Sequence, residues 1–393
     1  MSDNRPIWAH ALPTAILLMA PFDLLASLAM DIYLPVTPAM PAALQADPPV
    51  IQLTLSVYLL GLGLGQVIFG PLSDRFGRRP VLLSGALTFA VTSGLLAMAA
   101  SGWAFVVLRL AQAMGAAAML VATFATVRDV YGDKPESVRI YGLFSAMLAF
   151  VPAFGPVLGA LVSAQLSWRA IFWFLAALTL PPLMHALWRW TETRPLGEAS
   201  RPRPGPILRS RAFLIYTLAF GAAMGSFFVY VSTAPRILVE RVGLSELEFS
   251  LAFASTAFVM IVASHAARPC LDRWGVAGAV RRGMGLLLAS ALCFGASAAF
   301  GEPSIGSVIL PSWIMAVGIV LTVSVSANGA LEAFGDQAGL AVALYFAGQS
   351  LIVSLVGTLA VILFNGSTVW PLAAYTLTLP TLVLLGLNAS RKS

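Results

Sequence analysis

The amino-acid sequence predicts an all-α integral membrane protein with twelve transmembrane helices in two six-helix halves and both termini in the cytoplasm. Of its 393 residues, 59% are hydrophobic and only 10% are charged, whereas soluble domains carry about 25% charged residues. The apolar residues form segments of membrane-spanning length. The basic residues gather in alternate connections between these segments, and a proline-rich stretch divides the chain near its middle. Lipid is therefore the expected solvent.

Twelve segments have the length that a helix needs to cross a bilayer, about 20 apolar residues. They cover residues 11–33, 50–71, 80–100, 103–126, 138–163, 169–190, 212–234, 247–267, 282–301, 306–328, 338–363 and 368–388. The first segment follows Arg5 and could be mistaken for a signal peptide. Its apolar stretch is longer than the roughly 7–15 residues of a signal peptide's apolar region, so we keep it as a transmembrane helix.

The distribution of lysine and arginine predicts the orientation in the membrane. Nineteen of the 23 lie at the N-terminus, at the C-terminus or in every second loop, and three lie on the opposite face, Arg169, Arg236 and Arg241. The last, Arg109, lies inside a span. Because cytoplasmic loops carry the excess of basic residues, both termini are expected in the cytoplasm. This topology also accounts for the net charge of +6, so no nucleic-acid partner is expected.

The longest polar connection predicts the boundary between the two halves. It runs from Thr191 to Arg211 and contains Arg-Pro-Arg-Pro-Gly-Pro, which is incompatible with a helix interior. We therefore expect an N-terminal six-helix bundle at 1–190, a cytoplasmic linker at 191–211 and a C-terminal six-helix bundle at 212–393. The basic stretch 271–282 faintly repeats 70–80 at the corresponding place in the second half, which fits a transporter built from parallel repeats.

Three ionisable residues lie inside predicted spans. Asp23 is near the middle of the first span, about 18 Å from its cytoplasmic end at 1.5 Å per residue. An acid at that depth costs roughly 2.5–3.5 kcal/mol unless it is neutral, paired or in a water-filled cavity. Arg109 lies about 9 Å below the outer surface, and Asp31 lies near the outer end of the first span. Arg109 could instead extend to the surface, and Asp31 could be a solvated helix end.

Asp23 and Asp31 can face one cavity, because eight residues along a helix change direction by only about 80°. Burial favours the neutral acid, and a nearby guanidinium favours the carboxylate. A carboxylate between these two influences can take a proton from outside and release it inside. We therefore hypothesise that Asp23, Asp31 and Arg109 handle protons and substrate, and that Gln112, three residues after Arg109, hydrogen-bonds to the guanidinium.

The sequence offers no pattern for a metal site or an enzyme. Cys270 and Cys293 give no disulfide framework and no metal-ligand spacing, so we interpret them as reduced packing residues. A nucleotide-binding loop and a nucleophile elbow are both missing from the sequence. We expect no catalytic residue, no metal and no cofactor.

Several motifs resemble those of one transporter family. Residues 70–80, Gly-Pro-Leu-Ser-Asp-Arg-Phe-Gly-Arg-Arg-Pro, resemble the loop between the second and third helices of the major facilitator superfamily. Residues 108–117 resemble the fourth-helix motif of that family, with Ala113 at a usual glycine. Residues 142–160 resemble the fifth-helix motif of its drug/proton antiporters, with Ala160 at a usual glycine. The resemblance implies the major facilitator fold.

A narrower resemblance, to the phenicol exporters, covers the whole chain. It is carried by residues 22–35, 119–130 and 324–330. The resemblance implies proton-coupled efflux of chloramphenicol and florfenicol across the bacterial inner membrane, by a monomer that the proton gradient drives without a cofactor. A broader multidrug or metabolite exporter of the same fold is the main alternative. A passive facilitator or channel is a further one, which would need no titratable carboxylate.

The same resemblance implies roles for individual residues. Asp23, Asp31 and Arg109 would serve proton or substrate handling. The cavity would be lined by residues of four helices, Asp23, Ser27, Leu55, Arg109, Ala116, Met147 and Phe150. A cytoplasmic gate cluster would be formed by Asp74, Arg78 and Asp129. These three could instead be independent solvated charges, since an exposed ion pair contributes only about 0–1 kcal/mol.

Overall fold

A computed structural model describes residues 8, 10–131, 134, 136–194, 204–334 and 338–389, which form helices, turns and short connections. The elements are α1 (Leu12–Asp31), η1 (Leu34–Val36), α2 (Met40–Ala43), α3 (Pro48–Phe76), α4 (Arg78–Met98), α5 (Gly102–Tyr131), α6 (Glu136–Gln165), α7 (Trp168–Arg189), α8 (Pro204–Arg209), α9 (Arg211–Pro235), η2 (Arg236–Arg241), α10 (Glu246–Ala266), α11 (Arg268–Phe300), α12 (Ile305–Leu331), α13 (Ala338–Leu351), η4 (Ile352–Val356), α14 (Gly357–Leu363) and α15 (Trp370–Ala389). The predicted all-α class is confirmed.

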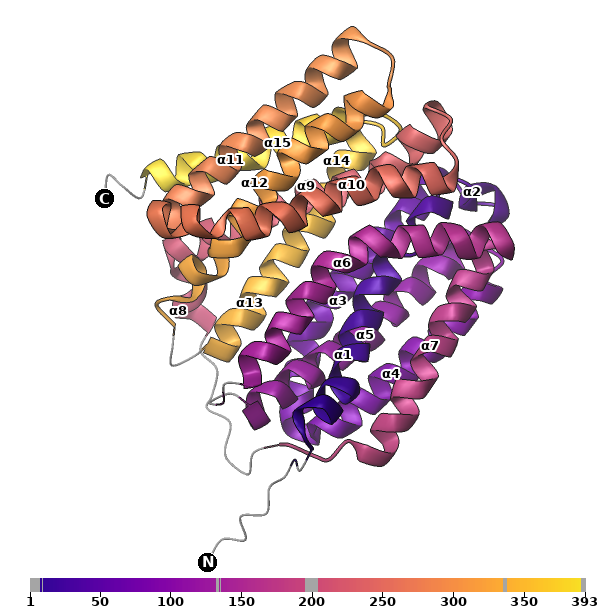
Figure 1. Cartoon of the computed structure of the whole chain (residues 1–393), viewed down its shortest axis with the longest axis vertical. Helices are drawn as coiled ribbons and strands as arrows, with labels where there is room; N and C mark the ends of the chain where they lie inside the picture. The colour runs from indigo at the N-terminus through magenta and orange to yellow at the C-terminus, as the bar shows by residue number, and fades with distance from the viewer. Residues whose placement is uncertain are drawn as a thin grey trace, which may run out of the picture.

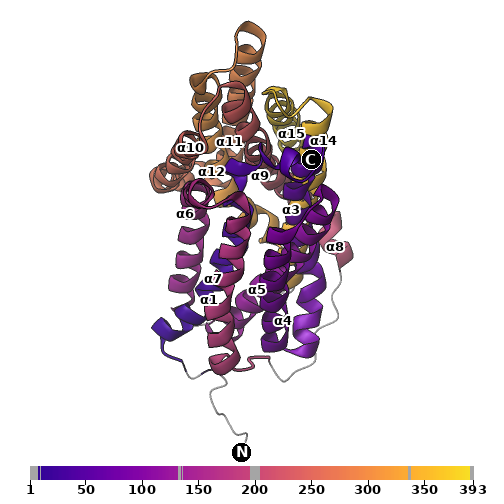
Figure 2. The same ribbon diagram turned by 90° about the vertical axis from the view of Figure 1, so that its right-hand side faces the viewer.

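The helices form two groups that lie side by side. Helices α1 to α7 make up the first group and α9 to α15 the second (Figure 1). The groups meet mainly where α6 packs on α10 and α3 packs on α13. A view turned by 90° shows the same separation (Figure 2). Below, "basic end" denotes the end of the molecule that carries Arg75, Arg79 and Arg128, and "distal end" the end that carries Thr37, Pro48 and Arg236.

Eleven of the described helices, some extended by an adjoining short turn, are long and apolar enough to cross a membrane. The remaining predicted span, 138–163, corresponds to α6, a 30-residue helix whose described apolar part is Phe150–Gln165. The multi-pass architecture predicted from hydropathy is therefore confirmed. Prolines at 152 and 156 lie inside α6, where each removes a backbone donor.

Some helix ends differ from the predicted ones, for local backbone reasons. The predicted span 212–234 continues as the π-helical turn η2 to Arg241. The element α11 runs from Arg268 to Phe300, but its backbone is non-helical at Gly275. The predicted span 282–301 is therefore the part of α11 that follows this kink, and it begins somewhat before residue 282. The proline-rich connection contains a short helix, α8, which begins at Pro204. This helix was not predicted; its two prolines occupy the first turn, where a backbone donor is not needed.

Two glycines give the repeated basic stretches a common backbone feature. Gly77 has φ +104° between α3 and α4, and Gly275 has φ +63° inside α11. Residues with a Cβ rarely adopt such conformations. Gly77 and Gly275 also occupy corresponding places in the two basic stretches, 70–80 and 271–282. The faint repeat seen in the sequence therefore has a counterpart in backbone geometry.

Small residues allow close approach of the helices that carry the candidate site. A Cβ added to Gly85 of α4 would lie 2.8 Å from the Gly115 carbonyl oxygen of α5. A Cβ on Gly155 of α6 would lie 3.3 Å from the Asp31 Cβ of α1. Close backbone approach through small residues is a general device of membrane helices. It brings α1, α4, α5 and α6 together around the ionisable residues.

Candidate functional site

Arg109 is fully buried in the first helix group, between two aromatic rings. Its guanidinium carbon lies 4.2 Å from the ring centroid of Tyr58 and 4.6 Å from that of Tyr33. Its exposed fraction is 0%. Cation–π contacts at such distances are favourable, more so when desolvated. The alternative that Arg109 extends to the surface is therefore wrong in this structure.

Hydrogen bonds from one nitrogen hold the Arg109 guanidinium. Its Nη1 donates to the Gln112 Oε1 at 2.6 Å and to the Ala29 carbonyl oxygen at 3.1 Å. The expected contact with Gln112 is therefore confirmed. Gln112 in turn donates from Nε2 to the Ser93 Oγ at 2.7 Å. This chain of hydrogen bonds connects α1, α5 and α4, so a shift of any one helix would strain the contacts of Arg109.

The two tyrosines also connect α1, and the turn that follows it, to α3. The Tyr58 hydroxyl donates to the Ala26 carbonyl oxygen at 2.7 Å, and the Tyr33 hydroxyl and the Thr54 Oγ1 share a hydrogen bond at 2.8 Å. Both tyrosines are fully buried. A buried hydroxyl that lacks a partner costs about 1–3 kcal/mol, so these bonds also fix the ring orientations. The hydroxyl groups of the two tyrosines thus fix the rings that cover Arg109.

The Arg109 guanidinium keeps two unused donors. Its Nε and Nη2 have no hydrogen-bond partner, although both are buried. Among the described residues, no carboxylate lies within 4.0 Å of its nitrogens. Buried charges in proteins are normally paired, so a cation held only by rings, an amide and a carbonyl is unusual. The Nε and Nη2 of Arg109 can therefore still donate hydrogen bonds to an acceptor atom.

Both carboxylates of α1 are buried and have an unused oxygen. Asp23 is 7% exposed and Asp31 is 5% exposed. The Oδ2 of Asp23 and the Oδ1 of Asp31 have no hydrogen-bond partner. The alternative that Asp31 is a solvated helix end is therefore wrong in this structure. The proton-handling role of Asp23, Asp31 and Arg109 stays a prediction.

The residues expected to line the cavity differ in their surroundings. Leu55 and Ala116 are buried, Ser27 and Met147 are half-buried, and Phe150 is exposed. Leu55 lines a pocket between the two helix groups at the distal end. The Phe150 ring packs against the Phe154 ring, with 6.0 Å between the two ring centroids. For all five residues, contact with a ligand stays a prediction.

The charge cluster expected at the basic end is formed. The Arg78 Nη1 lies 2.7 Å from the Asp74 Oδ1, and the Arg78 Nε lies 2.8 Å from the Asp129 Oδ2. The Arg78 side chain is 2% exposed and that of Asp129 6%, whereas Asp74 is 51% exposed. Arg78 thus joins the end of α3, the start of α4 and the end of α5. The three charges are not independent, and their role as a gate stays a prediction.

Sequence reasoning missed a residue next to this cluster, Glu192. Its carboxylate accepts hydrogen bonds from the backbone N–H groups of Arg78 at 2.8 Å and Arg79 at 3.2 Å. These are orphan donors at the start of α4, and a carboxylate also suits the positive end of the helix dipole. Two further contacts hold the same segment, from the Arg194 guanidinium to the Arg75 carbonyl oxygen and from the Arg79 guanidinium to the Leu187 carbonyl oxygen. The only sequence signal was an acid soon after a long apolar helix.

With this geometry in place, comparison with known proteins identifies the family. The Major Facilitator Superfamily profile matches residues 23–358. The chain belongs to the Major Facilitator Superfamily. The candidate site lies within the matched residues, and the members of this superfamily are multi-pass transporters, so the superfamily assignment agrees with the multi-pass architecture described above.

Two relatives within the superfamily are drug resistance proteins. The chain is 45% identical over 387 residues to a chloramphenicol resistance protein of Pseudomonas aeruginosa, covering 98% of this chain and 92% of that protein. It is 30% identical over 238 residues to the multidrug resistance protein MdtL of Escherichia coli strain K12, covering 60% of this chain and 61% of that protein. Both are bacterial proteins, which agrees with a multi-pass protein of the inner membrane.

A solved superfamily structure confirms the fold. The crystal structure of a D-xylose-proton symporter matches with a TM-score of 0.76 and 14% identity, covering 95% of this chain and 97% of that chain. At this identity the similarity concerns the fold alone. The predicted major facilitator fold is therefore confirmed.

Proposed function

We propose that this superfamily member exports phenicol antibiotics such as chloramphenicol and florfenicol and thereby confers resistance. The observation that carries the proposal is the 45% identity, across nearly the whole of both chains, to a chloramphenicol resistance protein. The geometry supports a neutral ligand with hydroxyl groups and acceptor oxygens. Arg109, Asp23 and Asp31 are buried and keep polar atoms without a hydrogen-bond partner. A few placed polar groups in apolar surroundings suit such a ligand.

Proton coupling forms part of the proposal. Asp23 and Asp31 each have an unused carboxylate oxygen, and Arg109 has two unused donors. A ligand hydroxyl that donates to a carboxylate at 23 would favour the deprotonated form, and so link drug binding to proton release. Alternating access between the two helix groups would then move drug and proton in opposite directions. The proton gradient supplies the energy, without a catalytic step or a cofactor.

The charge cluster and the linker have a place in this cycle. We propose that both termini are cytoplasmic, so that the basic end faces the cytoplasm. Asp74, Arg78 and Asp129 would then stabilise one conformation of that end. The halves 1–190 and 212–393 would move relative to each other about the linker 191–211, within a monomer.

A broader multidrug exporter is the second candidate function. The similarity to MdtL, a multidrug resistance protein, favours it. That similarity covers 60% of this chain, whereas the similarity to the chloramphenicol resistance protein covers 98%. The narrower substrate class therefore has more support.

Resistance profiles in a susceptible host test the proposal. The chain is expressed at matched levels, and growth is compared in chloramphenicol, florfenicol and cationic dyes, with an empty vector as control. Protection from phenicols with little protection from dyes is the expected result. Protection from both groups would favour the multidrug alternative, and protection from dyes alone would contradict phenicol export. Accumulation of labelled chloramphenicol, measured with and without a protonophore, separates driven export from passive flux, which a protonophore leaves unchanged.

A further inference from the structure

A small pocket lies between the two helix groups at the distal end. It is lined by residues of the connection between α1 and α3, of the first turns of α3, and of α9 and η2, namely Thr37, Pro41, Pro48, Ile51, Gln52, Leu55, Ser232, Arg236 and Glu240. A second pocket shares Gln52 and Ser232 with it and continues towards Ser56 and Thr358. Side chains from both groups therefore enclose a common space, and neither α3 nor α9 could form it alone.

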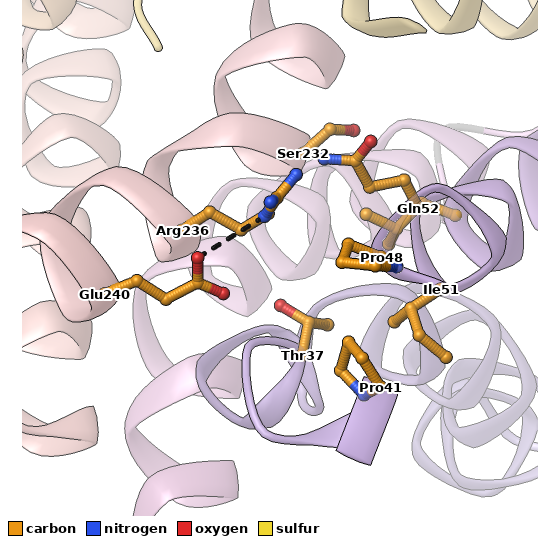
Figure 3. Close-up of a pocket in the computed structure, with 9 residues that line it drawn as sticks. Thr37, Pro41, Pro48, Ile51, Gln52, Ser232, Arg236 and Glu240 are labelled. Carbon is orange, nitrogen blue, oxygen red and sulfur yellow. Dashed lines mark ion pairs between the residues drawn. The ribbon is translucent and has the colours of Figure 1, made fainter. Parts of the chain in front are cut away.

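Three buried polar atoms around this pocket have no hydrogen-bond partner. They are the Nε2 of Gln52, the Oγ of Ser232 and the Nε of Arg236. Gln52 is 9% exposed and Ser232 is 5% exposed. Their side chains and that of Arg236 point towards one another from the two helix groups (Figure 3). Two of the three atoms are donors only, and the third can donate.

These donors are not explained by the contacts that surround them. The Arg236 Nε lies 3.6 Å from the Glu240 Oε2, an ion pair that is longer than a hydrogen bond. The neighbouring hydroxyls of Ser56 and Thr358 hydrogen-bond to each other across the two groups. Neither of them accepts a hydrogen bond from the three unpartnered atoms. Burial of a polar group without a hydrogen-bond partner is unfavourable. A set of three therefore points to an acceptor that is present during part of the transport cycle.

The position of the pocket indicates which acceptor this is. In the present conformation it has room for about one water molecule, because the two groups are in contact at the distal end. Separation of α3 from α9 would enlarge it. Leu55, which the resemblance places on the central cavity, lines the same pocket. A ligand that leaves the cavity implied by the resemblance towards the distal end would pass these donors.

We propose that Gln52, Ser232 and Arg236 form an exit subsite that receives the acceptor oxygens of the departing drug as the distal end opens. This inference rests on the proposed export of phenicols. The ligand class is a neutral aromatic compound with nitro or sulfonyl oxygens on its ring, since these groups accept hydrogen bonds without carrying a net charge. The subsite would lower the barrier to release and leave uptake from the cytoplasm unchanged.

Transport kinetics with a pair of ligands tests the subsite. Inverted membrane vesicles take up either chloramphenicol or the same molecule with its aromatic nitro group replaced by hydrogen. We expect the variant Gln52→Leu/Ser232→Ala to lower the maximal rate for chloramphenicol about five- to tenfold, the effect of losing one or two hydrogen bonds. The half-saturating concentration is expected to stay within about twofold, because uptake precedes the exit step. The rate for the ligand without the nitro group should be equal in wild type and variant.

Controls separate this inference from folding and from the proposed function. Ser264→Ala, at a half-buried serine whose Oγ donates to its own helix, is the matched control. If the double variant is absent from the membrane, the single variants Ser232→Ala and Gln52→Met are measured in the same way. Equal losses for both ligands, or no loss for chloramphenicol, would overturn the exit subsite alone. A wild type that transports neither phenicol would overturn the proposed function and the subsite with it.

Discussion

The guanidinium of Arg109 lies against the face of Tyr58, with 4.2 Å between the guanidinium carbon and the ring centroid. The ring belongs to α3 and the cation to α5, and the Tyr58 hydroxyl reaches the Ala26 carbonyl oxygen of α1. One side chain thus contacts the backbone of one helix and the charge of another. Because no carboxylate among the described residues pairs with Arg109, this ring is a principal contact of a buried charge.

Substitution of Tyr58 separates its two contacts. Tyr58→Phe keeps the ring over Arg109 and loses the hydrogen bond to α1, at a cost of about 1 kcal/mol. Tyr58→Leu loses the ring as well, which adds about 2 kcal/mol for a desolvated cation–π contact. We expect chloramphenicol efflux to fall moderately in the first variant and severely in the second. Efflux and thermal unfolding in detergent measure the two effects, and equal losses in both variants would contradict a role for the ring face.

Glu192 is expected to stabilise the start of α4. Glu192→Ala removes the acceptor for the Arg78 and Arg79 N–H groups, and about 1 kcal/mol of stability is expected to be lost. Glu192→Gln keeps an acceptor oxygen and loses the charge, so roughly half of that loss is expected. Unfolding midpoints of the purified variants provide the measurement. A glutamine variant as unstable as the alanine variant would show that charge, and not capping, is what matters.

The backbone at Gly77 predicts a second loss at the same turn. Its φ of +104° and ψ of 159° are essentially restricted to glycine, so Gly77→Ala should cost about 1–3 kcal/mol. An added Cβ would also meet the Glu192 carboxylate. The losses from Gly77→Ala and Glu192→Ala should therefore be less than additive, which a double-mutant cycle measures. Gly285→Ala is the control; it has open space around a helical glycine and should gain about 0.5–1 kcal/mol.

Asp23 is expected to couple drug movement to protons. Asp23→Asn keeps the size of the side chain and removes its titration. We expect binding of chloramphenicol to be retained while drug-induced proton release and driven efflux are lost. Asp47→Asn, an exposed acid at the start of α3, is the matched control and should behave as wild type. Unchanged proton release in Asp23→Asn would remove this residue from the coupling mechanism and leave Asp31 as the carrier to examine.

Hydropathy and motif chemistry predicted most of the architecture because both are local in sequence. The twelve spans follow from segment length, and the contact of Arg109 with Gln112 follows from their separation of three residues on one helix face. The rings over Arg109 could not be predicted in this way. Tyr33 and Tyr58 lie 76 and 51 positions away in sequence, and only the packing of α1, α3 and α5 brings them to the cation.

Two further features could not be predicted because they depend on contacts between segments that are distant in sequence. Glu192 follows α7 and contacts the start of α4, a pairing that neither charge pattern nor spacing indicates. The exit-subsite residues Gln52 and Ser232 belong to different helix groups, and each alone reads as an ordinary polar residue near a helix end. The short helix α8 was also not predicted. It can form because both of its prolines lie in its first turn.

Glu192 and Arg194 contact the turn between α3 and α4, so the start of the linker 191–211 is attached to the first helix group. On the other side, Ile207 of α8 is fully buried with Phe213 and Tyr345 and belongs to the second group. Arg194 and Pro204 are ten residues apart in sequence, so their Cα atoms can lie at most roughly 35 Å apart. This upper limit restricts how far the two bundles can separate along that edge, so rocking is geometrically permitted while wide detachment is not.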